Sequence, residues 1–194
     1  MSSKRHSILP STDRSGPKPP VNFSSSLTIS GNAVLQGTHS ITMQAETLIH
    51  PRSRFESHFG SILIGRRCLV YEQAHLGARP ADITNARPGG IAVGDYVTIE
   101  AKCVIEAGGT EIGESTLIQA GAKIGSGAKV GKNCTITQKS TIAPGVTIPD
   151  GTVVFANGTR RADRRESYDQ RKLTLIKQLG VLRKMIPSDP DKFK

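Results

Sequence analysis

The chain has 194 residues, a formal net charge of +10 and an isoelectric point of about 9.9. It contains no run of about 18 apolar residues, so we expect no membrane span. Three cysteines, an odd number, do not make a disulfide framework. Tryptophan is absent and aromatic residues make up 4% of the chain, which argues against a nucleic-acid interface built on stacking rings.

The positive charge is concentrated in the two tails. Residues 27–159 carry 11 basic and 10 acidic side chains, whereas residues 1–26 contribute +3 and residues 160–194 contribute +6. A nucleic-acid-binding protein typically shows a basic face on its folded part, so we expect no nucleic-acid partner. An acidic protein partner, or solvation alone, explains the tails better.

Residues 1–26 are rich in Ser, Pro and Lys/Arg. Such a composition buries too little apolar surface to offset chain entropy, so this segment is predicted to be a disordered or extended arm. It lacks the apolar stretch of a secretory signal. Together with the unpaired cysteines, this favours a cytoplasmic location.

From Val93 to Val154 the sequence repeats every six residues, with one extra residue after the third hexad. A period of six fits neither a helix nor a long half-buried strand, and it is typical of a hexapeptide β-solenoid. Three hexads make one triangular coil, and we predict about six coils over residues 27–159. The branched residues expected inside are Val93, Ile99, Ile105, Ile112, Ile118, Ile124, Val130, Ile136, Ile142, Ile148 and Val154.

A small residue follows each branched one by four positions and is expected where the wall bends inward. Cys68, Cys103 and Cys134 take this position, so we predict buried, reduced thiols. Before Val93 the register is interrupted near residues 35–43 and 55–62. Residues 77–90 contain two prolines and three glycines out of register and are predicted to form a loop.

Residues 160–194 are predicted to form a C-terminal helix and tail. Leu175, Leu179, Leu182 and Ile186 fall on one helical face, and Pro187 is a plausible stop. The apolar face either packs back along the coils or is presented to a partner.

The hexapeptide fold hosts two enzyme classes, γ-class carbonic anhydrases and acyltransferases. The first needs three converging histidines, and no histidine follows His75, so we expect no metal site. The second uses one histidine as general base; His75 is the only histidine beside the loop, and Glu72 precedes it by three. A solvated or structural histidine is the favoured interpretation, with less support still for His50 and His58.

The remaining polar residues predict no active site. The carboxylates Glu100, Glu106, Glu111 and Glu114 are expected on a solvated rim and form no acid/base pair. The sequence therefore predicts no catalytic residue, no cofactor-binding residue, no metal ligand and no cofactor.

Several stretches resemble the dynactin subunit 6 family of hexapeptide proteins. They are LIHPRSRFES, ILIGRRCLVYEQAHLGARP, VGDYVTIEAKCVIEAGGTEIG and the terminal KLTLIKQLGVLRKMIP. Together the resemblance covers about residues 27–187. The Ser/Pro/Arg arm and the basic residues Arg160–Arg165 depart from it.

The resemblance implies a left-handed parallel β-helix with a C-terminal α-helix. It also implies a structural, protein-binding and non-catalytic subunit of the pointed-end complex of dynactin, the activator of dynein-driven microtubule transport. The expected partners are the hexapeptide subunit 5, subunit 4 and an actin-related protein, in a hetero-oligomer associated with the cytoskeleton. The alternative is a hexapeptide acyltransferase, or a degenerate γ-carbonic-anhydrase-like homotrimer.

Overall fold

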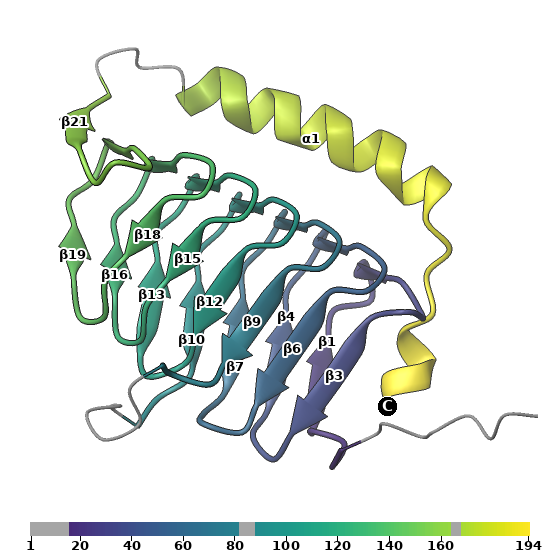
Figure 1. Ribbon diagram of the computed structural model, residues 1–194. Helices are drawn as coiled ribbons and strands as arrows, with labels where there is room; N and C mark the ends of the chain where they lie inside the picture. Colours follow the sequence, from purple (N-terminus) through teal and green to yellow (C-terminus); the bar gives the residue numbers. More distant parts are fainter. Residues whose placement is uncertain (1–15, 82–87, 164–167) are drawn as a thin grey trace, which may run out of the picture.

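The computed structural model describes residues 16–81, 88–163 and 168–194. Three parallel sheets form the sides of a prism, and the chain visits them in turn (Figure 1). The first sheet contains β1(Val21–Phe23), β4(Ile41–Met43), β7(Ile62–Ile64), β10(Ile91–Val93), β13(Thr110–Ile112), β16(Lys129–Val130) and β19(Thr147–Ile148).

The second and third sheets complete the prism. The second contains β2(Thr28–Ile29), β5(Leu48–Ile49), β8(Leu69–Val70), β11(Thr98–Ile99), β14(Leu117–Ile118), β17(Thr135–Ile136), β20(Thr152–Val154) and β21(Arg160–Ala162). The third contains β3(Val34–Gly37), β6(Arg54–Ser57), β9(His75–Ala78), β12(Val104–Glu106), β15(Lys123–Ile124) and β18(Thr141–Ile142).

The inward positions expected from the repeat form a continuous core. Every branched residue predicted between Val93 and Val154 is buried, and Cys68, Cys103 and Cys134 are fully buried among them. The small corner residues also join the coils. Thr47 Oγ1 donates a hydrogen bond to the Gly65 carbonyl at 2.7 Å, and Thr116 Oγ1 does the same to Gly131 at 2.9 Å.

Several corners of the coils hold a non-glycine residue at positive φ, a conformation that favours glycine. Tyr96, Ser115 and Asn133 stand at equivalent corners of successive coils, each with φ of 57°. This left-handed conformation costs about 1–2 kcal/mol for a non-glycine residue. Backbone hydrogen bonds hold it: the Ser115 N–H donates to the Asp95 carbonyl at 2.9 Å, and the Asn133 N–H donates to Glu114 at 2.8 Å.

The N-terminal boundary differs from the prediction. We expected an arm over residues 1–26 and a solenoid from residue 27, but β1 already pairs with β4, with Val21 opposite Ile41. The strand has only three residues and follows Pro19 and Pro20, so the sequence around it reads as part of the arm. Residues 1–15 lie outside the described part of the chain.

The loop predicted at 77–90 begins later in the structure. Gly77 and Ala78 belong to β9, and the connection to β10 follows them. Residues 82–87 lie outside the described part, as do residues 164–167.

The C-terminal segment folds back over the second sheet. α1(Tyr168–Met185) runs across the stacked coils (Figure 1), and Leu175 and Leu179 bury against Leu48 and Leu69. The predicted packing of the apolar helical face along the coils is therefore confirmed.

The same segment reaches both ends of the second sheet. β21 pairs antiparallel with β20 at one end, and Ser188 forms a bridge to Ser30 at the other. The short 3-10 helix η1(Pro190–Phe193) follows, and Phe193 packs against the end of the core. Open sheet edges attract other chains, so this arrangement protects two of them.

Candidate active site

The third sheet brings a histidine and a carboxylate together on its outer face. β6 and β9 are neighbours, with Arg54 opposite His75 in the ladder. His75 Nε2 lies 3.3 Å from Glu56 Oε2, and the two side chains are 27% and 17% exposed. The angles of this contact do not satisfy hydrogen-bond geometry. His75 Nε2 is buried and has no hydrogen-bond partner.

A cation shares the same carboxylate. Arg54 Nε lies 2.6 Å from Glu56 Oε1, and Arg54 Nη2 donates to Gln36 Oε1 at 3.1 Å. Glu56 therefore lies between a guanidinium and an imidazole. Such a carboxylate is held in place and is available to orient a histidine.

The neighbour expected for His75 in the sequence was Glu72, and the structure places it elsewhere. Glu72 forms an ion pair with Arg52. Gln73, at φ 59°, turns the chain between Glu72 and His75, so the two side chains leave different sides of a corner. Glu56 was missed because the early coils are longer than three hexads. Arg54 pairs with His75 across 21 residues, so an 18-residue period does not predict which residues lie beside His75.

The other described histidines have structural surroundings. His50 stacks on Tyr71 with 4.7 Å between ring centroids, and burial lowers the pKa of His50 although Glu72 opposes this. His39 Nδ1 lies 2.8 Å from the Ser57 carbonyl oxygen. His58 is exposed. His75 is therefore the best candidate for a proton-transfer role among these four.

The cysteines are poor nucleophiles. Burial raises the pKa of Cys68 to about 12 and that of Cys103 to about 11, and it also raises the pKa of Cys134. The Cys68 thiol donates to the Gly94 carbonyl at 3.1 Å. Thiolate is the reactive form, so these side chains belong to the core.

The four glutamates expected on a solvated rim mostly hold corners and coils together. Glu100 accepts a hydrogen bond from the Ala120 N–H at 2.9 Å, and Glu106 accepts one from Ser126 at 3.1 Å. Glu111 pairs with Lys129, and Glu114 accepts from Lys172 of α1 at 2.8 Å. None of these contacts joins two carboxylates.

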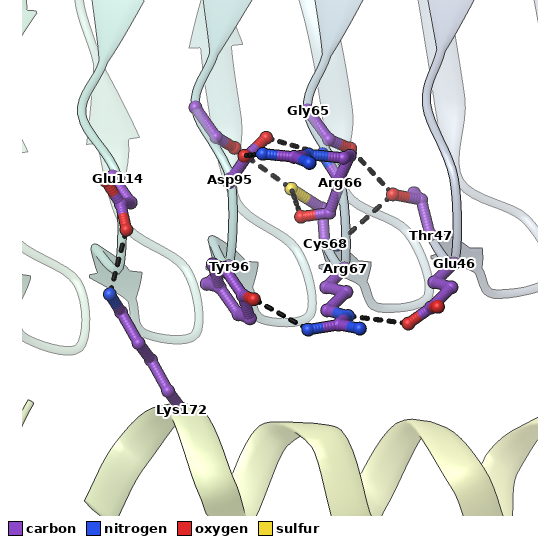
Figure 2. Close-up of polar contacts among 11 residues, drawn as sticks. Glu46, Thr47, Gly65, Arg66, Arg67, Cys68, Asp95, Tyr96, Glu114 and Lys172 are labelled. Atoms are coloured by element: carbon purple, nitrogen blue, oxygen red, sulfur yellow. Dashed lines mark hydrogen bonds and ion pairs between the residues drawn. The ribbon is translucent and has the colours of Figure 1, made fainter. Parts of the chain in front are cut away.

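A ladder of polar side chains runs along the corner beneath α1, and Figure 2 shows it. Arg67 donates to Glu46 at 2.6 Å and to the Tyr96 hydroxyl at 2.7 Å (Figure 2). Beside it, Asp95 accepts from the Arg66 backbone and from both ends of its guanidinium. The corner is thus fixed by side chains from consecutive coils.

Over residues 16–81, 88–163 and 168–194, no group of three or more His, Cys, Asp or Glu side chains could hold a metal ion. Within the same ranges, no helix is long and apolar enough to cross a membrane.

Comparisons with known proteins place the repeat and the fold. Residues 109–144 match the family described as bacterial transferase hexapeptide (six repeats). A hexapeptide transferase family protein from Anaplasma phagocytophilum shares the fold with a TM-score of 0.68 and 13% identity, covering 87% of this chain and 97% of that one. A putative acetyltransferase from Bacillus cereus gives a TM-score of 0.52 and 15% identity, covering 86% and 96%.

The chain folds as a left-handed parallel β-helix of hexapeptide repeats with one C-terminal α-helix. The predicted fold class is confirmed. The expectation that the chain is not an enzyme is wrong as an inference from this fold, because the proteins that match it along nearly their whole length are described as transferases. At such low identity the likeness establishes the fold alone.

Proposed function

We propose that the chain is an acyltransferase of the hexapeptide type, in which His75 is the general base and Glu56 orients it. The observation that carries the proposal is the pair itself, 3.3 Å apart on the outer face of the third sheet. The pair also lies at the end of the coil from which the connection to β10 departs. The transferases that share the fold support this choice of reaction.

In this proposal the two imidazole nitrogens have different tasks. Nε2 faces Glu56, so Nδ1 is the nitrogen that accepts the proton. An acceptor hydroxyl or amine loses its proton to Nδ1 as its oxygen or nitrogen attacks the carbonyl carbon of an acyl thioester. The carbon–sulfur bond breaks, and the imidazolium returns the proton to the leaving thiolate. Glu56 stabilises the imidazolium between these steps.

A single chain leaves this pair on an open sheet face. His75 is 27% exposed on the outside of a parallel sheet, where water competes with an acceptor. Catalysis by proton transfer requires that substrate be held within hydrogen-bond reach of the base. A second copy packed against the third sheet would close the site, so the proposal includes a homotrimer.

The test is release of free thiol from acetyl-coenzyme A with a panel of amino sugars and alcohols. His75→Asn should lower the turnover number by about 100-fold or more, the usual contribution of a general base. Glu56→Gln should lower it by about tenfold, because the imidazole loses its charged orienting partner.

His58→Asn is the matched control, because His58 is exposed on the same part of the chain, and it should leave the rate unchanged. No thiol release from the purified protein with any acceptor would count against the proposal. Equal rates for the wild type and His75→Asn would reject His75 as the base. Light scattering should give the mass of a trimer.

A second candidate function is a protein-binding subunit of the dynactin pointed-end complex. The observation that favours it is the placement of the stretches that resemble dynactin subunit 6. They occupy consecutive coils at residues 48–57, 62–80 and 93–113, and α1 buries Leu175 and Leu179 against Leu48 and Leu69 of those coils. The resemblance therefore covers one contiguous part of the molecule, including its terminal helix.

Co-purification discriminates the two functions. If the dynactin assignment holds, a tagged chain recovers the hexapeptide subunit 5, subunit 4, the actin-related protein and dynein from cytoplasmic extract, and His75→Ala does not change the recovery. A stable homotrimer with transferase activity and without these partners would reject it. The expected location in that case is the cytoplasm, on the cytoskeleton.

A further inference from the structure

A cavity lies between α1 and the second sheet, on a different side of the prism from His75. Its volume is about 390 Å³, at the small end of the range for ligand sites. Tyr71 and Tyr96 contribute aromatic walls, and Leu117 and Leu175 contribute apolar ones. Arg171 and Lys172 of α1 also line it.

The ladder of polar side chains along the corner explains why a cavity remains between the coils and α1. Glu46, Arg67 and Tyr96 follow one another on successive coils and bond side chain to side chain. On the next coil the equivalent residue is Ser115, whose short side chain does not continue the ladder. Because serine is much shorter than tyrosine, a hollow remains beside Tyr96, lined by Ser115.

Two polar groups that line this hollow lack partners. Ser115 is 6% exposed, and its hydroxyl has no hydrogen-bond partner. Arg171 Nε is also buried without a partner. A buried donor left unpaired costs about 1–3 kcal/mol, so each is expected to meet an acceptor.

The rest of the Arg171 guanidinium is held by other contacts. Nη1 donates to Thr135 Oγ1 at 2.9 Å, and Nη2 lies 3.5 Å from Asp163 Oδ2. The group also lies over the Tyr168 ring, 5.3 Å from its centroid. These contacts fix the guanidinium, so its remaining Nε–H has a set position. A preorganised donor of this kind binds an anion with little loss of side-chain entropy.

Two other charged side chains, Lys172 and Glu100, also line the cavity. Lys172 donates to Glu114, and Glu100 accepts from the Ala120 N–H. The two groups without a partner, Arg171 Nε and the Ser115 hydroxyl, can both donate a hydrogen bond, so an acceptor between them would satisfy both.

We propose that the cavity between α1 and the second sheet binds a small organic oxyanion, a carboxylate or a phosphate monoester. Arg171 Nε and the Ser115 hydroxyl donate to the anionic oxygens. The planar or apolar part of the ligand lies between Tyr71 and Tyr96. Because the ligand touches both the coils and the helix, its binding stabilises the docked position of α1.

Calorimetric titration of the full-length protein tests the proposal with two probes, inorganic phosphate and benzoate. Saturable binding of either at millimolar concentration is the expected result, and preference between them distinguishes a phosphate ligand from a carboxylate one. Arg171→Gln and Ser115→Ala should each weaken binding by about tenfold, the effect of losing one charge-assisted hydrogen bond.

Two controls match these changes. Lys177→Gln removes a positive charge from an exposed position of the same helix, and Ser126→Ala removes a buried hydroxyl at a corner outside the cavity. Both should bind as the wild type does. Ser115→Ala keeps the test valid if Arg171→Gln loosens the helix, because no hydrogen bond from the Ser115 hydroxyl holds α1.

Failure of both probes to bind would overturn the proposal. So would unchanged affinity in Ser115→Ala and Arg171→Gln. A crystal soaked with both anions that shows only an ordered water between Arg171 Nε and Ser115 Oγ would overturn it as well, since water then meets the demand of both donors.

Discussion

The early and late coils share one core but differ outside it. β3, β6 and β9 of the early coils have four residues each, whereas β15 and β18 of the late coils have two. Ile41 pairs with Ile62 across a coil of 21 residues, and Lys129 pairs with Thr147 across one of 18. Residues inside are buried equally in both regions. The extra residues therefore lengthen the outer wall without changing the interior.

The longer wall is rich in arginine–carboxylate pairs. Four arginine–carboxylate pairs lie in the early coils or join them to the next, those of Arg52, Arg54, Arg66 and Arg67. All five histidines precede β10 as well. The irregular coils therefore carry the histidine–carboxylate pair, whereas the regular coils supply part of the cavity wall under α1.

The largest effect is expected from a charge placed in the regular coils. Ile124 is 1% exposed, so Ile124→Asp buries a carboxylate among aliphatic side chains and should cost about 4 kcal/mol or more. Lys123→Asp is the matched control, because Lys123 is exposed on the same strand. Urea unfolding measures both, and similar midpoints would show that the late coils lack a dry core.

Replacing one glycine by alanine should destabilise the irregular region much more than the regular one. A Cβ on Gly90 would overlap the Ser61 carbonyl oxygen, so Gly90→Ala should prevent normal packing of the coil after the loop. Gly145, at φ 69°, has open space around it, and Gly145→Ala should cost only about 1 kcal/mol. Thermal melts compare the two. A mild effect at Gly90 would mean that this coil adjusts its backbone.

The C-terminal helix α1 packs against the early coils, so loosening it should affect them more than the late coils. Leu179 is 3% exposed and packs with Leu48 and Leu69, so Leu179→Ala should cost about 2–3 kcal/mol. Leu173→Ala, at a position 59% exposed, is the control. Hydrogen exchange should rise in β5 and β8 and stay low in β16 and β18. Equal loosening everywhere would mean that the solenoid unfolds as one unit.

The sequence predicted the late coils better than the early ones for a physical reason. A strict six-residue period identifies the inward residues from Val93 onward, and the pattern Leu175–Leu179 identifies the helix face. β1 was missed because its three residues lie between two prolines and three serines, although Phe23 precedes Ile29 by the same six residues. Glu56 was missed because its approach to His75 depends on pairing between coils of irregular length, which no local pattern contains.

The smallest difference in stability is expected between two equivalent corners, one beside the early coils and one in the late coils. The Asp95 carboxylate accepts from the Arg66 N–H, and the Asp150 carboxylate accepts from the Lys132 N–H, each at 2.7 Å. Only Asp95 also bonds a guanidinium, through Arg66 Nε and Nη2. Burial opposes its ionisation, but the Arg66 backbone and side chain outweigh burial and hold the pKa of Asp95 below its usual value.

Asp95→Asn should therefore destabilise more than Asp150→Asn at neutral pH, since an asparagine oxygen still accepts the backbone N–H but loses the ionic contact. The pKa of Asp95 is lower in the folded state than in the unfolded state. The ionised carboxylate therefore contributes its full share of the free energy of unfolding above the unfolded pKa of about 4. That share is lost as the pH falls through the folded pKa. The difference between wild type and Asp95→Asn should shrink when urea unfolding is repeated at decreasing pH. A difference that stays constant would show that Asp95 acts there only as a neutral acceptor, and the early corner would then be no more ionic than the late one.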